Sequence, residues 1–217
     1  APSFSGDCDT TGHVTLAVGD AKTCVITNDD IQPLLTVTKV VINDNGGTAK
    51  VSNFPLFVDG HGVTSGQSNG FNAGLHGVSE TGSSAYTESI SGDCDQGGNV
   101  NLAPGDVKSC TITNNDIQPR LTVIKHVTND NGGTATVEDF LLHVGETSVS
   151  SGQTHGFDAG QYSVGESGPG GYSGTFSGDC DSEGTVSLSV GDNKTCVLTN
   201  DDIQPQLTIT KVVVNDN

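Results

Sequence analysis

The sequence contains neither methionine nor tryptophan, and it has few basic residues. Its 8 lysine and arginine residues are outnumbered by 26 aspartate and glutamate residues, which gives a formal net charge of −18. Basic patches supply much of the affinity for nucleic acid and for anionic membranes, so we expect neither as a partner. No apolar run approaches the roughly 20 residues that a membrane-spanning helix needs, so we expect no membrane insertion in this segment.

The short motifs of common enzyme classes are also missing. The sequence has no G-x-S-x-G nucleophile elbow, no P-loop and no H-E-x-x-H zinc motif. Its six histidines occupy no equivalent positions in the internal repeat of the chain, so we expect no repeated histidine site. We therefore predict that the chain is not an enzyme and needs no cofactor, with calcium as the one candidate ion.

What the sequence does contain is a long repeat. Near-copies of the segment SGDCDTTGHVTLAVGDAKTCVITNDDIQP begin at Ser5, Ser91 and Ser177, which gives a period of 86 residues. Each copy is followed by a strand-like run: LLTVTKVVINDN, RLTVIKHVTNDN or QLTITKVVVNDN. Self-similarity at a fixed period is the signature of a tandem array of modules.

Cutting the chain after each IQ pair predicts four parts. Residues 33–118 form a complete first module and residues 119–204 a complete second module. Residues 1–32 form the C-terminal half of a module, and residues 205–217 the first strand of a further one. A half-module buries a core poorly, so either the chain is part of a longer array or neighbouring chains complete its ends.

Strand exchange between chains is the sharper version of that second alternative. Residues 205–217 of one chain would add to residues 1–32 of the next and place Lys211 near Asn28. The two pieces together hold far fewer residues than a full module, so a longer array is the simpler interpretation.

The local sequence pattern predicts β-structure throughout each module. The run 35–42 (LTVTKVVI) is rich in β-branched residues and ends at the turn cluster NDNGG. Further strands are expected within 53–60 and 70–80, and Pro55 favours an irregular or edge position. Short strands between Gly, Asn and Asp turns indicate an all-β fold of tandem immunoglobulin-like β-sandwich modules.

The cysteines recur as one pair in each copy, with the same spacing. Closely spaced C-x-x-C pairs of zinc sites are absent, so the pattern indicates one disulfide per module. Disulfides persist in oxidising surroundings, which predicts an extracellular or cell-surface location. The predicted disulfide pairs are Cys8–Cys24, Cys94–Cys110 and Cys180–Cys196.

Three polar residues of each module fall on faces that are expected to be buried. Alternation along the first strand places a lysine beside Leu35 and Val37, and alternation along the last strand places an asparagine beside Ile112. A glutamate shares a face with Val78 in the same way. The residues are Lys39, Glu80 and Asn114 in the first module, and Lys125, Glu166 and Asn200 in the second.

These three residue types can react with one another. Burial favours a neutral, nucleophilic lysine and a protonated glutamate, which can polarise the asparagine amide and shuttle protons. Attack by the amine would expel ammonia and leave an isopeptide bond between the first and last strands. The alternative is a lysine that reaches towards solvent and forms an ion pair with the glutamate.

The pattern resembles a known family. A lysine in LTVTK, the motif G-x-Y-x-V-x-E at residues 160–166 and T-N at the end of the last strand are similar to the collagen-adhesin B-type, or prealbumin-like, stalk domain. This resemblance implies a surface protein or pilin of Gram-positive bacterial type, in which many members carry a Lys–Asn isopeptide bond promoted by an acidic residue. The first module departs from the motif, because His76 stands where the pattern has tyrosine.

Acidic and amide residues also cluster near the module ends. If the first and last strands run parallel side by side, the NDN turn approaches the outgoing junction, which includes Asn115. Oxygen-rich clusters of this kind suit calcium, although such residues are equally good turn formers. The candidate calcium ligands are Asp44, Asn45, Asp116, Asp130, Asn131, Asp201 and Asp202.

These patterns predict an extracellular structural protein. We expect a cell-surface stalk or filament, whose partners are other copies of itself. The alternative is an adhesin that binds a glycan or a host protein through variable loops, such as 58–65 and 144–151, which differ between the copies. The surface ligand of such an adhesin is not indicated by the sequence.

Overall fold

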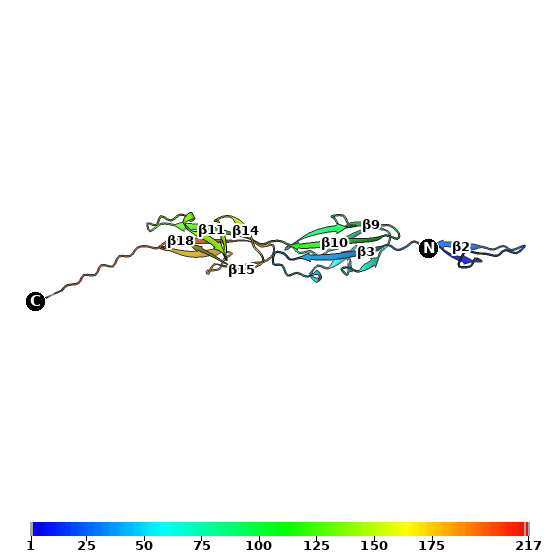
Figure 1. Ribbon diagram of the computed structural model, residues 1–217, viewed down its shortest axis with the longest axis horizontal. Coiled ribbons are helices and arrows are strands. Elements are labelled where there is room, and N and C mark those ends of the chain that lie inside the picture. The colour runs from blue at the N-terminus through cyan, green and yellow to red at the C-terminus, as the bar shows by residue number, and fades with distance from the viewer. Residues whose placement is uncertain (1, 215, 217) are drawn as a thin grey trace. The chain divides into compact units, whose positions relative to one another are not determined.

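The structure is a computed structural model that describes residues 2–214 and 216. The described chain divides into two compact units, one of residues 1–41, 50–82 and 88–114, and one of residues 42–49, 83–87 and 115–217. Most of one sandwich of two four-stranded sheets lies in each unit (Figure 1). The all-β fold predicted from the sequence is confirmed, and the only helical elements within the described residues are two short 3-10 turns.

The strands from β3 to β10 make up the first sandwich. Its sheets have the orders β6-β3-β10-β8 and β5-β4-β7-β9. The elements are β3 (Leu34–Ile42), η1 (Val51–Asn53), β4 (Leu56–Val58), β5 (His61–Val63), β6 (Ser68–Gly70), β7 (Gly74–Glu80), β8 (Tyr86–Gly92), β9 (Asn99–Leu102) and β10 (Val107–Asp116).

The strands from β11 to β18 make up the second sandwich, which repeats this order. Its sheets are β14-β11-β18-β16 and β13-β12-β15-β17. The elements are β11 (Arg120–Thr128), η2 (Val137–Asp139), β12 (Leu141–Val144), β13 (Thr147–Val149), β14 (Thr154–Gly156), β15 (Gly160–Ser167), β16 (Tyr172–Gly178), β17 (Thr185–Leu188) and β18 (Asn193–Asp202).

Alternation along the strands forms the core as predicted. In β3, Leu35 and Val37 are buried, whereas Leu34 and Val40 are exposed. The run 53–60 yields a shorter strand than expected, because η1 occupies its start and Pro55 cannot donate a ladder hydrogen bond. Leu56 and Val58 of β4 still reach the core.

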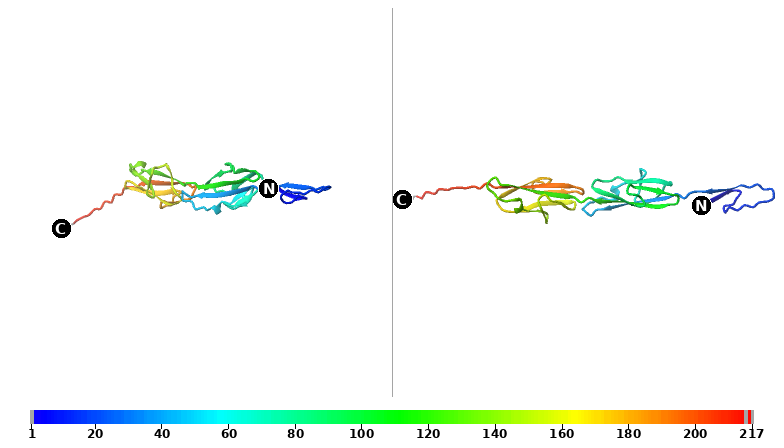
Figure 2. Two further views of the ribbon diagram at one scale, coloured as in Figure 1. Left: turned by 45° about the vertical axis from the view of Figure 1, so that its right-hand side comes forward. Right: turned by 90° about the horizontal axis from the view of Figure 1, so that it is seen from above.

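The first and last strands of each sandwich are sheet neighbours. In the second sandwich, β11 pairs with β18 in parallel over nine residue pairs, from Arg120–Asn193 to Thr128–Asp201. In the first sandwich, β3 lies beside β10, as the views in Figures 1 and 2 show. This neighbour relation brings the two ends of each repeat together within one unit.

The two ends of the chain are simpler. Strands β1 (Pro2–Gly6) and β2 (Cys24–Asn28) form a two-stranded antiparallel hairpin in which all of β2 is exposed. Residues 205–214 form no strand. Residues 215 and 217 of the predicted opening strand lie outside the described residues, and the module boundaries at residues 32, 118 and 204 stay a prediction.

Candidate functional site

Each sandwich buries one lysine in its apolar core. Lys39 and Lys125 are 4% and 3% exposed, and each continues the buried row of its first strand. Their amines lie over aromatic rings, 4.9 Å from the ring centroid of Phe54 and 4.4 Å from that of Phe140. A charged amine is costly in such surroundings unless an acidic group accompanies it.

A glutamate on the opposite sheet accompanies each amine. Nζ of Lys39 lies 2.6 Å from Oε2 of Glu80, and Nζ of Lys125 lies 2.9 Å from Oε2 of Glu166. Burial lowers the pKa of Lys125, against the opposing effect of Glu166. The second lysine is therefore closer to a neutral, nucleophilic state than a lysine in water.

The same glutamate also contacts the buried asparagine of the last strand. Oε1 of Glu80 accepts a hydrogen bond of 2.6 Å from Nδ2 of Asn114, and Oε1 of Glu166 accepts one of 2.5 Å from Nδ2 of Asn200. One carboxyl group thus bridges the amine and the amide nitrogen in each site. The structure brings both predicted Lys–Glu–Asn sets together, and the isopeptide bond itself stays a prediction.

The asparagine carbonyl groups are left without partners. Oδ1 of Asn114 and Oδ1 of Asn200 are buried and have no hydrogen-bond partner among the described residues. An unsatisfied buried oxygen costs roughly 1–3 kcal/mol. Such a cost is tolerated most readily where the group has a chemical role.

The three predicted cysteine pairs are joined as disulfides. Cys94–Cys110 and Cys180–Cys196 lie in the cores of the first and second sandwiches, and Cys8–Cys24 ties the β1–β2 hairpin. Each bridge joins residues 16 positions apart, and no described cysteine is free. In each sandwich the disulfide therefore fastens the last strand to the loop that follows β8 or β16.

The candidate calcium residues do approach one another, but in each turn one carboxylate already accepts hydrogen bonds from backbone amides. Asp116 accepts hydrogen bonds from the amides of Asp44, Asn45 and Gly47, at 3.1, 3.0 and 2.8 Å. Asp202 is held in the same way by Asp130, Asn131 and Gly133. These carboxylates close a turn, so a cation would compete with N–H donors for their oxygens.

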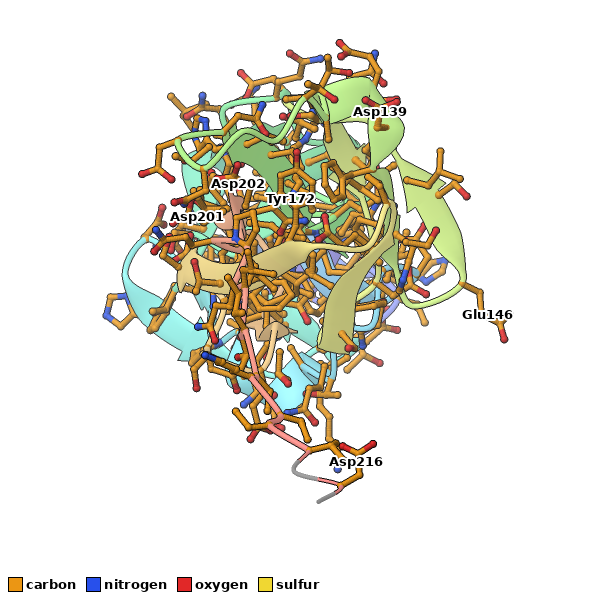
Figure 3. All side chains as sticks on the ribbon, turned by 90° about the vertical axis from the view of Figure 1, so that its left-hand side faces the viewer. Asp139, Glu146, Tyr172, Asp201, Asp202 and Asp216 are labelled. Atoms are coloured by element: carbon orange, nitrogen blue, oxygen red, sulfur yellow. A yellow bond between two sulfur atoms is a disulfide. The ribbon has the colours of Figure 1, made fainter. Side chains whose placement is uncertain are left out.

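The two turns differ in acidity. Carboxylate oxygens of Asp130, Asp201 and Asp202 lie within 4.8 Å of one another, whereas Asn115 stands at the position of Asp201 in the first copy of the repeat. Figure 3 shows Asp202 beside Tyr172, whose hydroxyl donates to Asn129 at 2.6 Å, while Glu146 projects away. Calcium binding stays a prediction, and it is better suited to the second turn.

His76 forms a contact that the sequence did not indicate. Its Nδ1 lies 2.7 Å from Oδ2 of Asp59, and its Nε2 lies 2.8 Å from the carbonyl oxygen of Asn72. In the second sandwich, Tyr162 donates to the equivalent carbonyl, that of Asp158, at 3.0 Å. The histidine thus takes over the tyrosine's hydrogen bond and adds an acidic partner.

The variable loops border shallow hollows. A hollow of about 310 Å³ in the first sandwich is lined in part by Val58, Asp59 and His61. One of about 530 Å³ in the second sandwich includes Ser148, Val149 and Ser150. Both volumes are large enough for a small polar ligand.

Glu88 is a further residue that sequence reasoning missed. It lies on β8, and burial together with the charge and carboxyl group of Glu80 raises its pKa. The only signal in the sequence is a difference between the copies, because Gly174 occupies the equivalent position.

The model of the family described as "Prealbumin-like fold domain" matches residues 30–112 and 116–198. No curated protein matches the sequence. No helix within residues 2–214 is long and apolar enough to cross a membrane.

Several solved structures are similar at low identity. The Bacillus anthracis TIE protein is 14% identical with a TM-score of 0.45, and the match covers 84% of this chain and 37% of that protein. A major pilin of Streptococcus pyogenes is 16% identical with a TM-score of 0.32, over 81% of this chain and 98% of the pilin. A second major pilin of that species is 15% identical with a TM-score of 0.33, over 93% and 89%.

Because these TM-scores are low, the function of this chain has to follow from its own residues. The family model alone covers well over half of the sequence, as two tandem domains that each contain the buried lysine and glutamate of one set, while Asn114 and Asn200 lie two residues beyond the matched ranges. The chain therefore belongs to the family of prealbumin-like fold domains.

Proposed function

We propose that this chain is a load-bearing segment of an extracellular stalk or filament, in which each sandwich is cross-linked by a Lys–Asn isopeptide bond. The observation that carries the proposal is the carboxyl group of Glu80, which contacts both Nζ of Lys39 and Nδ2 of Asn114. Glu166 makes the same two contacts in the second sandwich. One carboxyl group in each sandwich therefore joins the amine that would attack to the amide nitrogen that would leave.

The geometry supports a complete reaction. A proton passes from Nζ to Oε2 of the glutamate, and the neutral amine attacks Cγ of the asparagine. The Nζ–Cγ bond forms and the Cγ–Nδ2 bond breaks as the carboxyl group gives its proton to Nδ2 and then takes the second proton that Nζ loses. Ammonia leaves, and one amide bond joins the first strand to the last. No external reagent is needed.

Tandem domains and disulfides support the extracellular and structural parts of the proposal. Disulfides persist in oxidising compartments. The net charge of −18 keeps such a chain soluble and disfavours nucleic acid. Other copies of the chain are the partners that a filament would require, and the cross-linking chemistry acts within the chain rather than on a substrate.

The test is the intact mass of the purified chain before and after reduction, followed by peptide mapping. We expect the loss of one ammonia per sandwich, resistant to reduction and located at Lys39–Asn114 and Lys125–Asn200. The variants Glu80→Gln and Glu166→Gln should each abolish the loss in one sandwich and leave the other as a control. If the reduced chain has its full unmodified mass, no isopeptide bond has formed, and the two lysines are ordinary ion-paired residues.

A second candidate, an adhesin, is favoured by one observation. The loops that differ between the copies line the hollows of about 310 and 530 Å³. Glycan-array screening of the chain, with His61→Ala as a comparison, tests it. Binding that survives changes in both loops would count against these hollows as the site.

A further inference from the structure

The first site has a carboxyl group that the second site lacks. Glu88 lies on β8, next to β10 in the sheet, and its counterpart Gly174 is paired with Asn200. A Cβ on Gly174 would lie 3.0 Å from Oδ1 of Asn200 and 3.7 Å from Oε1 of Glu166. A side chain at this position therefore begins directly over the contact between glutamate and asparagine.

The Glu88 carboxyl group interacts electrostatically with the buried glutamate of its own site. Partial burial raises the pKa of Glu88, the charge and carboxyl group of Glu80 raise it further, and Lys39 opposes both weakly. The Glu80 side chain is 0% exposed, whereas that of Glu166 is 17% exposed. The first site thus has a second carboxyl group, that of Glu88, and a fully buried Glu80, whereas the second site has Gly174 at that position and a partly exposed Glu166.

Glu88 is itself exposed, so it exchanges protons with solvent. Its protonated form can donate a hydrogen bond to the Glu80 carboxylate and stabilise that anion. Its ionised form repels the anion, and for Glu88 the repulsion by Glu80 outweighs the attraction by Lys39. Ionised Glu88 therefore favours the state in which Glu80 holds the proton and Lys39 is neutral.

We propose that Glu88 is a positioning residue of the first site, whose carboxylate drives the Lys39 proton onto Glu80 and so activates the amine towards Asn114. This inference rests on the proposed cross-link and adds a regulation to it. The two sandwiches of one chain would react with different pH dependence. Glu88 forms no bond itself, and the bonds that form and break remain those between Lys39 and Asn114.

Refolding makes the reaction measurable. Chain isolated in denaturant from inclusion bodies has not assembled its sites, so refolding in buffers of increasing pH starts the reaction. Peptide mapping at successive times gives the ammonia loss at each site separately. We expect the rate at Lys39–Asn114 to rise several-fold as Glu88 ionises, and the rate at Lys125–Asn200 in the same chain to lack this rise.

Two variants separate the charge of Glu88 from the space that its side chain fills. Glu88→Gln keeps a side chain of the same size and remains neutral, so we expect the first site to stay at its slow rate at every pH. Glu88→Gly copies the second site, so we expect the first site to follow the pH profile of the second. Gly174→Glu should introduce the rise at the second site.

The outcomes distinguish this role from the cross-link itself. Ammonia loss at the first site with the same pH profile in the wild type and Glu88→Gln would overturn the role of Glu88 and leave the cross-link standing. No ammonia loss at either wild-type site at any pH would overturn both proposals. A uniform slowing by Glu88→Gln without a change in the profile would indicate a structural effect only, and would also contradict a positioning role for Glu88.

Discussion

The carboxylate of Asp116 holds the amide of Gly47, 69 residues earlier in the chain, at 2.8 Å. The same carboxylate accepts from the amides of Asp44 and Asn45. Burial alone would raise the pKa of Asp116, but the hydrogen bonds from Gly47 and Asn45 outweigh it and lower the pKa. The ionised Asp116 side chain thus stabilises the turn that follows β3 by accepting hydrogen bonds from its backbone amides.

Replacement of Asp116 should loosen this turn. Asp116→Ala leaves several amides without an acceptor, so we expect a loss of about 1–3 kcal/mol in the free energy of unfolding of the first sandwich. Hydrogen exchange at the Gly47 amide should accelerate first. Asp44→Ala is the control, since that exposed side chain accepts a hydrogen bond from Asn45, and the variant keeps the Asp44 backbone amide that donates to Asp116. Equal effects of the two variants would contradict the assignment.

The pair His76–Asp59 should make the first sandwich sensitive to pH. The hydrogen bond to Asp59 raises the pKa of His76, and the bonds from Gly77 and His76 lower the pKa of Asp59. The histidine contribution is complete below its unfolded pKa and is lost as the pH rises through its raised pKa. The aspartate contribution is present above its unfolded pKa and is lost as the pH falls through its lowered pKa.

Stability from this pair is therefore greatest at weakly acidic pH. Asp59 is 46% exposed, so we expect about 1 kcal/mol or less. The variant His76→Tyr copies Tyr162 of the second sandwich and should flatten the pH dependence of thermal unfolding. A wild-type melting temperature of the first sandwich that is constant from acidic to mildly alkaline pH would show that the pair contributes nothing measurable.

Loss of a disulfide should cost more than either change. The Cys94–Cys110 bridge closes a loop with a sequence separation of 16, for which the chain-entropy estimate is about 3 kcal/mol. We expect the double variant Cys94→Ala/Cys110→Ala to lower the denaturation midpoint of the first sandwich and to leave the second unchanged. Reduction of the wild type should lower both. If Lys39 and Asn114 are joined, a fully folded first sandwich should persist after reduction.

Calcium should distinguish the two turns. The second turn brings together Asp130, Asp201 and Asp202, whereas the first has Asn115 at the position of Asp201. If an ion binds, its addition to chelated protein raises the melting temperature of the second sandwich only. Asp201→Asn makes the second turn resemble the first and should remove the effect. Unchanged melting with chelator or calcium would leave the carboxylates as turn residues alone.

Most of the correct predictions of buried residues came from the alternation of side chains along the strands. It placed Lys39 and Asn114 on buried faces from sequence alone, because a period of two leaves no other face for them. The expectation that the first and last strands are parallel neighbours also placed Asp116 near the NDN turn. Both arguments need only the backbone repeat and the apolar pattern.

The remaining features depend on side-chain reach between distant segments. Nothing in the local pattern around Glu88 indicates that its carboxyl group interacts with Glu80, and only Gly174 in the other copy marks the position as unusual. The contact between His76 and Asp59 likewise depends on the turn between β4 and β5, where Asp59 adopts a positive φ of 50°. Backbone amides around Asp116 were missed because their directions follow from turn geometry, not from residue type.

The parallel pairing of β11 and β18 has a mechanical consequence. Tension applied along the chain would enter β11 at its N-terminal end and leave β18 at its C-terminal end, so it would shear the two strands and load all their hydrogen bonds at once. A covalent bond between Lys125 and Asn200 would carry the force directly from β11 to β18. The chain between these two residues, including the Cys180–Cys196 bridge, would then bear no force, and the sandwich would transmit tension without lengthening.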